Sequence, residues 1–203
     1  MENKTVIGFI GAGNMAYALI KGLLSDGFEA KNINVSDANL ELLEKRSSEL
    51  GVTTYSDNVS LLTNSDIVVF AVKPQVLSVV CHELKNKASS DQLFVSIVAG
   101  IKSKDINRWL GGDFALVRTM PNTPALFQSG VTGLFANELV NDTQKESVNL
   151  LLSAVGECFW VNEENLLDAI TAISGSGPAY FFLMMQSMKQ AAMALGLDEE
   201  TAD

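Results

Sequence analysis

The segment from Val6 to Ser25 constrains the fold most strongly, because an apolar run passes through a glycine turn into a helix-like repeat. Val6–Ile10 is a continuous apolar run of the kind that lies buried on both faces in a parallel sheet. Gly11, Gly13 and Ala16 follow in the pattern G-x-G-x-x-A. The first glycine permits a tight turn, the second lets a pyrophosphate approach the backbone, and the small third residue lets helix pack on strand. This order predicts a dinucleotide site; the alternative is a glycine turn that serves packing alone.

Strands and helices are expected to alternate over most of the chain. Further apolar runs predict strands, and segments with helical spacing separate them; these strands lie at residues 33–36, 53–55, 67–72, 93–98, 115–120, 130–136 and 157–161. Ser103 is the expected N-cap of a short helix. The alternation predicts an α/β fold, with a Rossmann-like, doubly wound and mostly parallel sheet.

The pattern changes after Val161, where no further strand is expected. Residues 163–173 predict a helix, Ser174–Gly177 a break, and Pro178 the first turn of another helix. Asp198 is expected to cap a third helix. We therefore expect a dinucleotide-binding domain over residues 1–161 and the beginning of an all-helical domain over residues 162–203.

Charge and composition exclude several classes of partner. The net charge of −10 argues against nucleic acid or an anionic membrane surface as the main partner. We expect no secretory leader and no membrane-spanning helix, since no segment approaches roughly 20 consecutive apolar residues. Cys81 and Cys158 match no metal or redox spacing, so we expect buried thiols in a cytoplasmic protein and no metal site. His82 is the only histidine, which argues against a histidine-based triad.

The residues leave the cofactor preference open. The end of the second strand, expected beside the adenosine ribose, reads Val35-Ser36-Asp37. An acidic group there accepts from a 2′-hydroxyl and repels a 2′-phosphate, which favours NAD. However, Ser36 can donate to a phosphate, and Asp37 can equally point to solvent. Lys45 and Arg46 follow only a turn or two into the next helix.

Three further loops follow the carboxyl ends of strands, where ligands of such sheets bind. The loop 71–75 is expected along the cofactor, and the small residues of 98–100 leave room for a nicotinamide ring. The loop 120–124 supplies neutral donors and acceptors at Asn122 and Thr123. For each loop the alternative is an ordinary connection between strand and helix.

Five segments, taken together, resemble a known family. GFIGAGNMAYALIKGLL, AVKPQVL, SIVAGI, RTMPNTPALFQSGVTGL and AITAISGSGPAYFFLMM occur in this order and span nearly the whole chain. They resemble pyrroline-5-carboxylate reductase, and MPNTP followed by SGSGPAY is far more specific than the glycine motif. The resemblance implies a Rossmann-like domain and a helical domain through which subunits form homodimers or larger homo-oligomers.

The implied activity is the last step of proline biosynthesis, the reduction of 1-pyrroline-5-carboxylate to L-proline, usually by NADPH and in some members by NADH. One alternative is another imine or β-hydroxyacid reductase of the same architecture, although that family carries a catalytic lysine where this chain reads SGSGPAY. Another is a module that binds the cofactor without turnover.

The resemblance also implies roles for individual residues. The phosphate loop is Gly11, Ala12, Gly13, Asn14 and Met15. The other implied cofactor contacts are Ser36 at the ribose, Asn58 near the adenine, Ala71, Val72, Lys73 and Pro74 along the cofactor, and Ala99 and Gly100 at the nicotinamide. The implied active-site residues are Asn122, Thr123 and Glu164, with Ser176, Gly177 and Ala179 at the cleft.

Two of these residues have competing interpretations. Lys73 invites a role as catalytic base, but we favour a positioning or electrostatic role, or an ordinary loop lysine. Glu164 is either an acidic group near the substrate or a solvated glutamate at a helix start. The resembling family continues for several helices beyond the position of Asp203. Those helices include a serine- and glycine-rich loop around the substrate carboxylate, so we expect this chain to be shortened.

Overall fold

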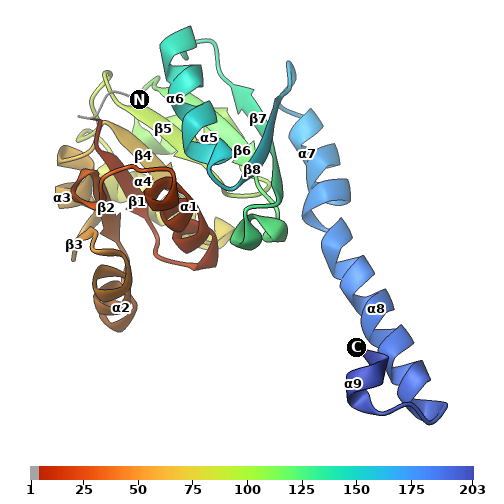
Figure 1. Cartoon of the computed structure of the whole chain (residues 1–203). Coiled ribbons are helices and arrows are strands. Elements are labelled where there is room, and N and C mark those ends of the chain that lie inside the picture. The colour runs from red at the N-terminus through yellow and green to blue at the C-terminus, as the bar shows by residue number, and fades with distance from the viewer. Residues whose placement is uncertain (1–4) are drawn as a thin grey trace.

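The computed structural model describes residues 5–203 and shows one sheet flanked by helices, with a helical arm leaving its edge (Figure 1). The strands are β1 (Ile7–Ile10), β2 (Ile33–Ser36), β3 (Thr53–Tyr55), β4 (Ile67–Phe70), β5 (Leu93–Ser96), β6 (Ala115–Met120), β7 (Gly130–Ala136) and β8 (Gly156–Trp160). The sheet helices are α1 (Asn14–Ser25), α2 (Leu40–Leu50), α3 (Asn58–Thr63), α4 (Pro74–Leu84), α5 (Ser103–Leu110) and α6 (Asp142–Ser153). The arm holds α7 (Leu166–Ile170), a π-helical turn (Thr171–Gly175), α8 (Gly177–Ala194) and α9 (Glu199–Ala202).

The strand order is β3-β2-β1-β4-β5-β6-β7-β8. All neighbouring pairs are parallel except β6 and β7, which are antiparallel. Ile7 is the register partner of Ile33 on one side and of Ile67 on the other. Strands β2 and β3 thus lie on one side of β1, and β4 to β8 lie on the other. This change of side creates the crevice between β1 and β4 where doubly wound sheets bind ligands. This arrangement confirms the predicted Rossmann-like, mostly parallel sheet.

Two apolar clusters cover the two faces of the sheet. Side chains of α1, α2 and α6 pack on one face, among them Leu19, Leu43 and Leu151. Side chains of α3, α4 and α5 pack on the other, among them Leu77 and Ile106. The central strands are buried on both faces, as the unbroken apolar runs predict.

The first helix of the arm lies against the sheet through a glycine. A Cβ atom at Gly133 of β7 would collide with the Cδ1 atom of Ile170 in α7. Leu167, on the same helix, is 1% exposed. The missing side chain on β7 thus lets α7 approach the strand closely and anchors the base of the arm.

The predicted break at Ser174–Gly177 is wrong. The chain remains helical from Leu166 to Ala194, and Thr171–Gly175 forms a π turn within that helix. A Cβ atom at Gly175 would lie 2.8 Å from Cε of Met120, so the glycine permits a close approach to the end of β6. Pro178 does lie in the first turn of α8, and Asp198 caps α9 by accepting from the Thr201 N–H at 2.8 Å, as predicted.

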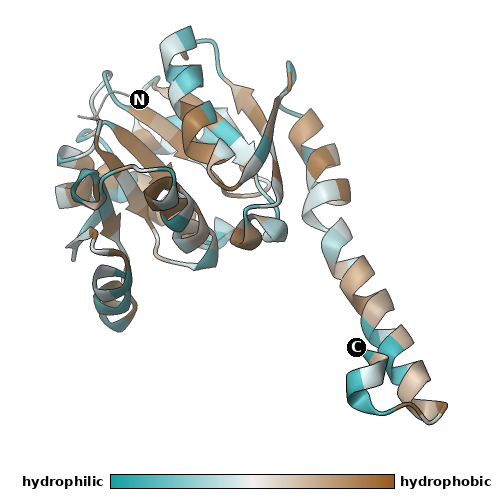
Figure 2. Ribbon diagram, viewed as in Figure 1, coloured by the Kyte–Doolittle hydropathy of each residue, from teal (hydrophilic) through white to brown (hydrophobic). Residues whose placement is uncertain are grey.

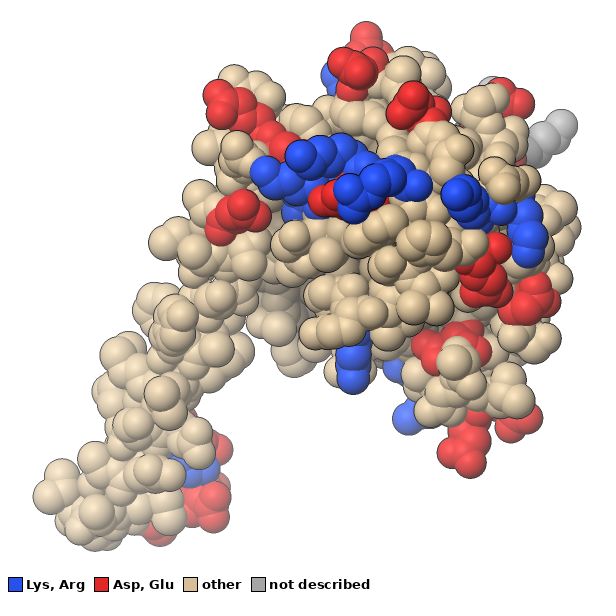
Figure 3. Space-filling model, turned by 180° about the vertical axis from the view of Figure 1, so that it is seen from behind, with Lys and Arg blue, Asp and Glu red and all other residues tan. Residues whose placement is uncertain are grey.

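The shaft of the arm, residues 169–188, is mostly apolar and exposed (Figure 2). Residues 169–188 contain no charged side chain, and Figure 3 shows this shaft as a bare stretch between the charged body and the arm's tip. An 18-residue window of the helix Leu166–Ala194 has a mean hydropathy of 1.2, and 6% of that window is buried, so the helix meets the length and composition of a membrane span. The expectation that no segment does so was therefore wrong, although these two criteria are weak evidence for a membrane.

Candidate active site

A crevice of about 410 Å³ opens where β1, β2 and β4 end. It collects residues from three loops that are far apart in the sequence. Its lining is Ile10, Gly11, Gly13, Ser36, Asp37, Ala38, Asn39, Leu42, Asn58, Ala71, Val72, Lys73, Val76 and Val80. Of the predicted cofactor-binding residues, it thus brings together Gly11, Gly13, Ser36, Asn58, Ala71, Val72 and Lys73.

The two glycines of the loop are required for different reasons. Gly11 has φ +107°, and a Cβ atom there would collide with the carbonyl group of Ala71. Gly13 has φ −66° and ψ −175°, an extended conformation open to any residue, and a Cβ atom there would meet nothing within 4 Å. Protein geometry therefore requires Gly11, whereas the space beside Gly13 is free for a ligand that must approach the backbone.

The start of α1 supplies hydrogen-bond donors to that space. Gly13 is the N-cap and has no side chain that could bond the free N–H groups, and no acidic residue lies in the first turn. Backbone N–H groups of a first helical turn have no carbonyl partner within the helix, and the helix dipole favours an anion beside them. The residues present thus fit the pyrophosphate of a dinucleotide.

The side of the crevice that is predicted to hold the adenosine is organised by side-chain hydrogen bonds. Ser36 Oγ donates to Asn58 Oδ1 at 2.8 Å, and Asn58 Nδ2 donates to Glu83 Oε2 at 2.8 Å. Asp37 points to the backbone: Oδ2 accepts from the Ala12 N–H at 2.8 Å and Oδ1 from the Asn39 N–H at 2.9 Å. The Asp37 carboxylate is therefore bonded to the backbone at both oxygens, and Asp37 also lines the crevice.

The other predicted cofactor residues lie outside the lining of the crevice. Ala12 is 1% exposed, beneath the loop. Asn14, Pro74 and Gly100 are exposed, while Met15 and Ala99 are half-buried. Contacts of these residues with a cofactor remain predictions.

Asn122 connects the end of β6 to the arm. Its Nδ2 donates to Ser174 Oγ at 3.0 Å, and its Oδ1 accepts from the Val131 N–H at 2.9 Å. The neighbouring Thr123 is exposed at the start of a short 3-10 helix, Thr123–Phe127. The predicted MPNTP and SGSGPAY motifs thus meet in space, through Asn122 and the π turn that holds Ser174.

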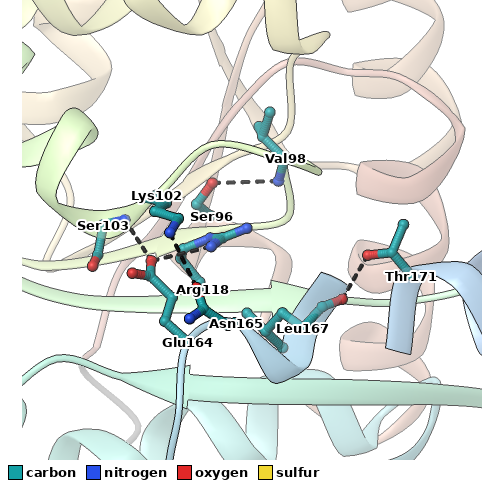
Figure 4. Close-up of polar contacts among 9 residues, drawn as sticks. All are labelled: Ser96, Val98, Lys102, Ser103, Arg118, Glu164, Asn165, Leu167 and Thr171. Carbon is teal, nitrogen blue, oxygen red and sulfur yellow. Dashed lines mark hydrogen bonds and ion pairs between the residues drawn. The ribbon is translucent and has the colours of Figure 1, made fainter. Parts of the chain in front are cut away.

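Glu164 joins three elements at the base of the arm (Figure 4). Its Oε1 accepts from the Ser103 N–H at 2.6 Å and from Arg118 Nη1 at 3.1 Å. The Arg118 side chain is 5% exposed and that of Glu164 is 17% exposed. The Glu164 carboxylate is therefore neither solvated nor free of partners. Its proximity to a substrate stays a prediction.

The same contact corrects the predicted cap of α5. Lys102, not Ser103, is the N-cap, and its side chain makes no capping bond. Glu164 satisfies the N–H of Ser103 instead, and Lys102 Nζ donates to Asn165 Oδ1 at 3.0 Å. An anion at a helix N-terminus is electrostatically favourable, so the arm caps α5.

Arg118 and Ser174 were not among the predicted site residues. Arg118 did carry a signal, because a charged residue inside an apolar strand must find a partner when the strand is buried. Its Nε atom is buried with no partner among the described residues. Ser174 carried no signal beyond its place in SGSGPAY.

Comparisons with known proteins decide the family. Residues 6–100 match the family model described as NADP oxidoreductase coenzyme F420-dependent, and residues 164–203 match the one described as pyrroline-5-carboxylate reductase dimerisation. The pyrroline-5-carboxylate reductase of Pseudomonas aeruginosa is 47% identical over 196 residues, which cover 97% of this chain and 72% of that protein. The chain belongs to the pyrroline-5-carboxylate reductase family.

Solved structures of the family superpose on nearly the whole chain. A pyrroline-5-carboxylate reductase from Coxiella burnetii has a TM-score of 0.90 and 42% identity, covering 98% of this chain and 74% of that one. A Plasmodium falciparum pyrroline carboxylate reductase, solved with NADP bound, has a TM-score of 0.87 and 30% identity, covering 98% of this chain and 73% of that one. The resemblance inferred from the motifs is therefore confirmed, and so is the fold of both parts of the chain.

Proposed function

We propose that this protein reduces 1-pyrroline-5-carboxylate to L-proline with NADPH, and that NADH can serve in its place. The observation that carries the proposal is the 47% identity to the Pseudomonas aeruginosa reductase over 97% of the chain. The fit of the crevice to a dinucleotide supports the choice of cofactor, since Gly13 leaves open space against the start of α1. The relative from Plasmodium falciparum was solved with NADP bound.

The proposed reaction does not depend strongly on an acidic or basic side chain of the protein. Bound NADPH supplies the hydride, and a protonated C=N bond is already a strong electrophile, so orientation and exclusion of water dominate the protein's contribution. We assign the cofactor-binding role to the loops after β1, β2, β4 and β5, which hold the predicted residues Gly11–Met15, Ser36, Asn58, Ala71–Pro74 and Ala99–Gly100.

We assign the substrate side of the site to the junction of Asn122, Thr123 and the π turn. Asn122 is 8% exposed and fixed at both ends of its amide by Val131 and Ser174, so it orders this junction. Glu164 holds the base of the arm in the same region through Arg118. Lys73 is exposed at the N-cap of α4, where a positive charge lies beside the crevice without an ordered acid-base partner among the described residues.

We further propose that the domains divide after Val161 and that the arm pairs with a second copy of the chain. Six consecutive residues of α8, Tyr180–Met185, are each more than half exposed and apolar in character. Six residues span more than a full helical turn, so the apolar surface surrounds the helix and one flat contact cannot cover it. An intertwined homodimer covers such a helix on several sides, and we place the enzyme in the cytoplasm.

The test is oxidation of NADPH and of NADH with 1-pyrroline-5-carboxylate, on protein whose intact mass has been verified. We expect turnover that requires both substrates, L-proline as the product, and a dimeric or larger mass in solution. The variant Gly13→Asp is the control, because its side chain and charge enter the pyrophosphate space and should abolish turnover. Cofactor binding without L-proline formation would show a binding module and would reject the proposed reaction.

A further inference from the structure

The phosphate loop is held from behind by two charged side chains of the β2–α2 unit. Asp37 accepts from the N–H of Ala12 at 2.8 Å, and Arg46 Nε donates to the carbonyl oxygen of Ala12 at 3.1 Å. These two groups belong to the peptide units on either side of the Ala12 Cα atom. Asp37 therefore fixes the orientation of one peptide plane, and Arg46 fixes that of the next.

The second of these bonds determines where the next donor points. In a trans peptide the C=O and N–H groups point in opposite directions. The carbonyl of Ala12 points to Arg46, a residue that is 7% exposed, so the N–H of Gly13 in the same peptide plane points away from Arg46. Gly13 lines the crevice, and a side chain there would meet only open space.

Arg46 is itself rigidly placed. Its guanidinium carbon lies 4.2 Å from the ring centroid of Tyr17 on α1, and its Nη1 pairs with Glu49 at 3.2 Å. A cation held over an aromatic ring and bonded at two further atoms has little freedom to move toward a ligand. Its side chain is 9% exposed in that ion pair, which argues against a direct contact with cofactor.

Asp37 is likewise committed to the protein. Both of its carboxylate oxygens accept backbone N–H groups, from Ala12 and Asn39. Its charge is thus used to close the β2–α2 turn onto the phosphate loop. Although Asp37 lines the crevice, each of its oxygens is already bonded to the backbone, so a ribose 2′-hydroxyl would have to share an oxygen with an N–H group.

Resting on the proposed dinucleotide binding, we propose that Asp37 and Arg46 are positioning residues that aim the phosphate loop, and that Asp37 does not select between NADH and NADPH. The two side chains act through Ala12 and need no contact with the cofactor. Replacing either side chain should weaken the binding of every ligand that contains the pyrophosphate by a similar factor. A fragment without the pyrophosphate should be spared.

The experiment measures dissociation constants by calorimetry for three probes: NADPH, NADH and 2′-AMP. In Arg46→Met we expect NADPH and NADH each to bind about tenfold more weakly. The variant loses one hydrogen bond from a charged group, and with it the fixed orientation of the peptide plane between Ala12 and Gly13. Binding of 2′-AMP should stay within about threefold of the wild-type value. Arg46→Lys keeps the charge and a donor, and should recover part of the loss.

Lys45→Met is the matched control. Lys45 is the preceding residue of α2, its side chain is 63% exposed, and it lies 3.8 Å from the same Glu49. This variant removes an equal charge from the same helix without touching Ala12, so we expect no change in any of the three constants. A loss equal to that of Arg46→Met would show that the helix charge alone matters and would overturn the proposal.

Asp37→Asn provides a second, independent test and replaces Arg46→Met if that variant does not fold. The Asn amide can accept only one of the two N–H groups, so NADPH and NADH should weaken together and their ratio should stay within about threefold. A shift of that ratio by tenfold or more in favour of NADPH would show that Asp37 reads the ribose and would overturn the inference. So would a loss of 2′-AMP binding in Arg46→Met as large as that of NADPH.

The proposed reaction and this inference fail separately. A wild-type protein that binds both dinucleotides but makes no L-proline rejects the reaction, and the binding constants of the variants still decide the roles of Asp37 and Arg46. A wild-type protein that binds neither dinucleotide rejects both.

Discussion

Substituting alanine separately at Gly11 and at Gly13 should separate the folding role of the phosphate loop from its binding role. Gly13→Ala should leave the fold intact, because the extended backbone accepts any residue and the added Cβ atom meets nothing within 4 Å. The free energy of unfolding should stay constant or rise by about 0.4–1 kcal/mol, since alanine restricts the unfolded chain. Binding should suffer instead, because the methyl group occupies the space that a pyrophosphate needs.

The expected size of that loss follows from the donors at the start of α1. A hydrogen bond to a charged group contributes about 1.5–3 kcal/mol, so losing one bond from N–H to phosphate weakens NADPH about 10- to 150-fold. Gly11→Ala should behave in the opposite way. Its φ of +107° and the carbonyl of Ala71 make an added Cβ atom strained, at about 1–3 kcal/mol for the backbone alone.

Calorimetric titration with NADPH and a thermal melt of both variants measure the two effects. We expect Gly13→Ala to melt with the wild type and to bind weakly, and Gly11→Ala to melt earlier by about 2–4 °C for each kcal/mol lost. If the dissociation constant of Gly13→Ala for NADPH lies within about twofold of the wild-type value, the assignment of the loop is refuted. Gly13→Ala that melts well below the wild type would refute the geometry on which the assignment rests.

Three other expectations concern the ion pair at the base of the arm, the cysteines and the loop lysine. Arg118→Met or Glu164→Leu alone should cost about 3 kcal/mol of stability in denaturant titrations, while the double variant should cost less than the sum; strict additivity would contradict a coupled pair. Burial raises the pKa of Cys81 to about 12 and that of Cys158 to about 11, so both thiols stay protonated at neutral pH; rapid alkylation of the native protein would contradict this. Lys73→Met should reduce turnover by less than about tenfold, whereas a loss of several orders of magnitude would identify a catalytic proton donor.

The local sequence was sufficient to predict the sheet and most of its helices. The strands Ile33–Ser36 and Ala115–Met120 have the predicted bounds, because apolar runs and flanking turn residues agree there. The crevice was also predictable, since the loop after each strand must lie at one edge of a parallel sheet. Its polar details were not predictable, because only the fold shows that Asp37 bonds the backbone of the loop.

The errors fall where distant segments determine local structure. Serine and glycine at 174–177 indicate a break, but contacts of the π turn with Asn122 and Met120 keep the helix continuous. The cap of α5 comes from Glu164, 61 residues further along the chain, which no pattern around Ser103 reveals. Tertiary contacts override local preference at both places.

The unbroken helix from Leu166 to Ala194 makes the arm a lever. Its 29 residues at about 1.5 Å each reach about 43 Å from the seat on β7. A tilt of about 5° at that seat therefore moves the far end by about 4 Å, the width of a side chain. Because Asn122 bonds to the helix near its pivot, small shifts at the end of β6 are magnified at the tip, and movements of a second subunit on the tip are reduced to fine adjustments at Asn122.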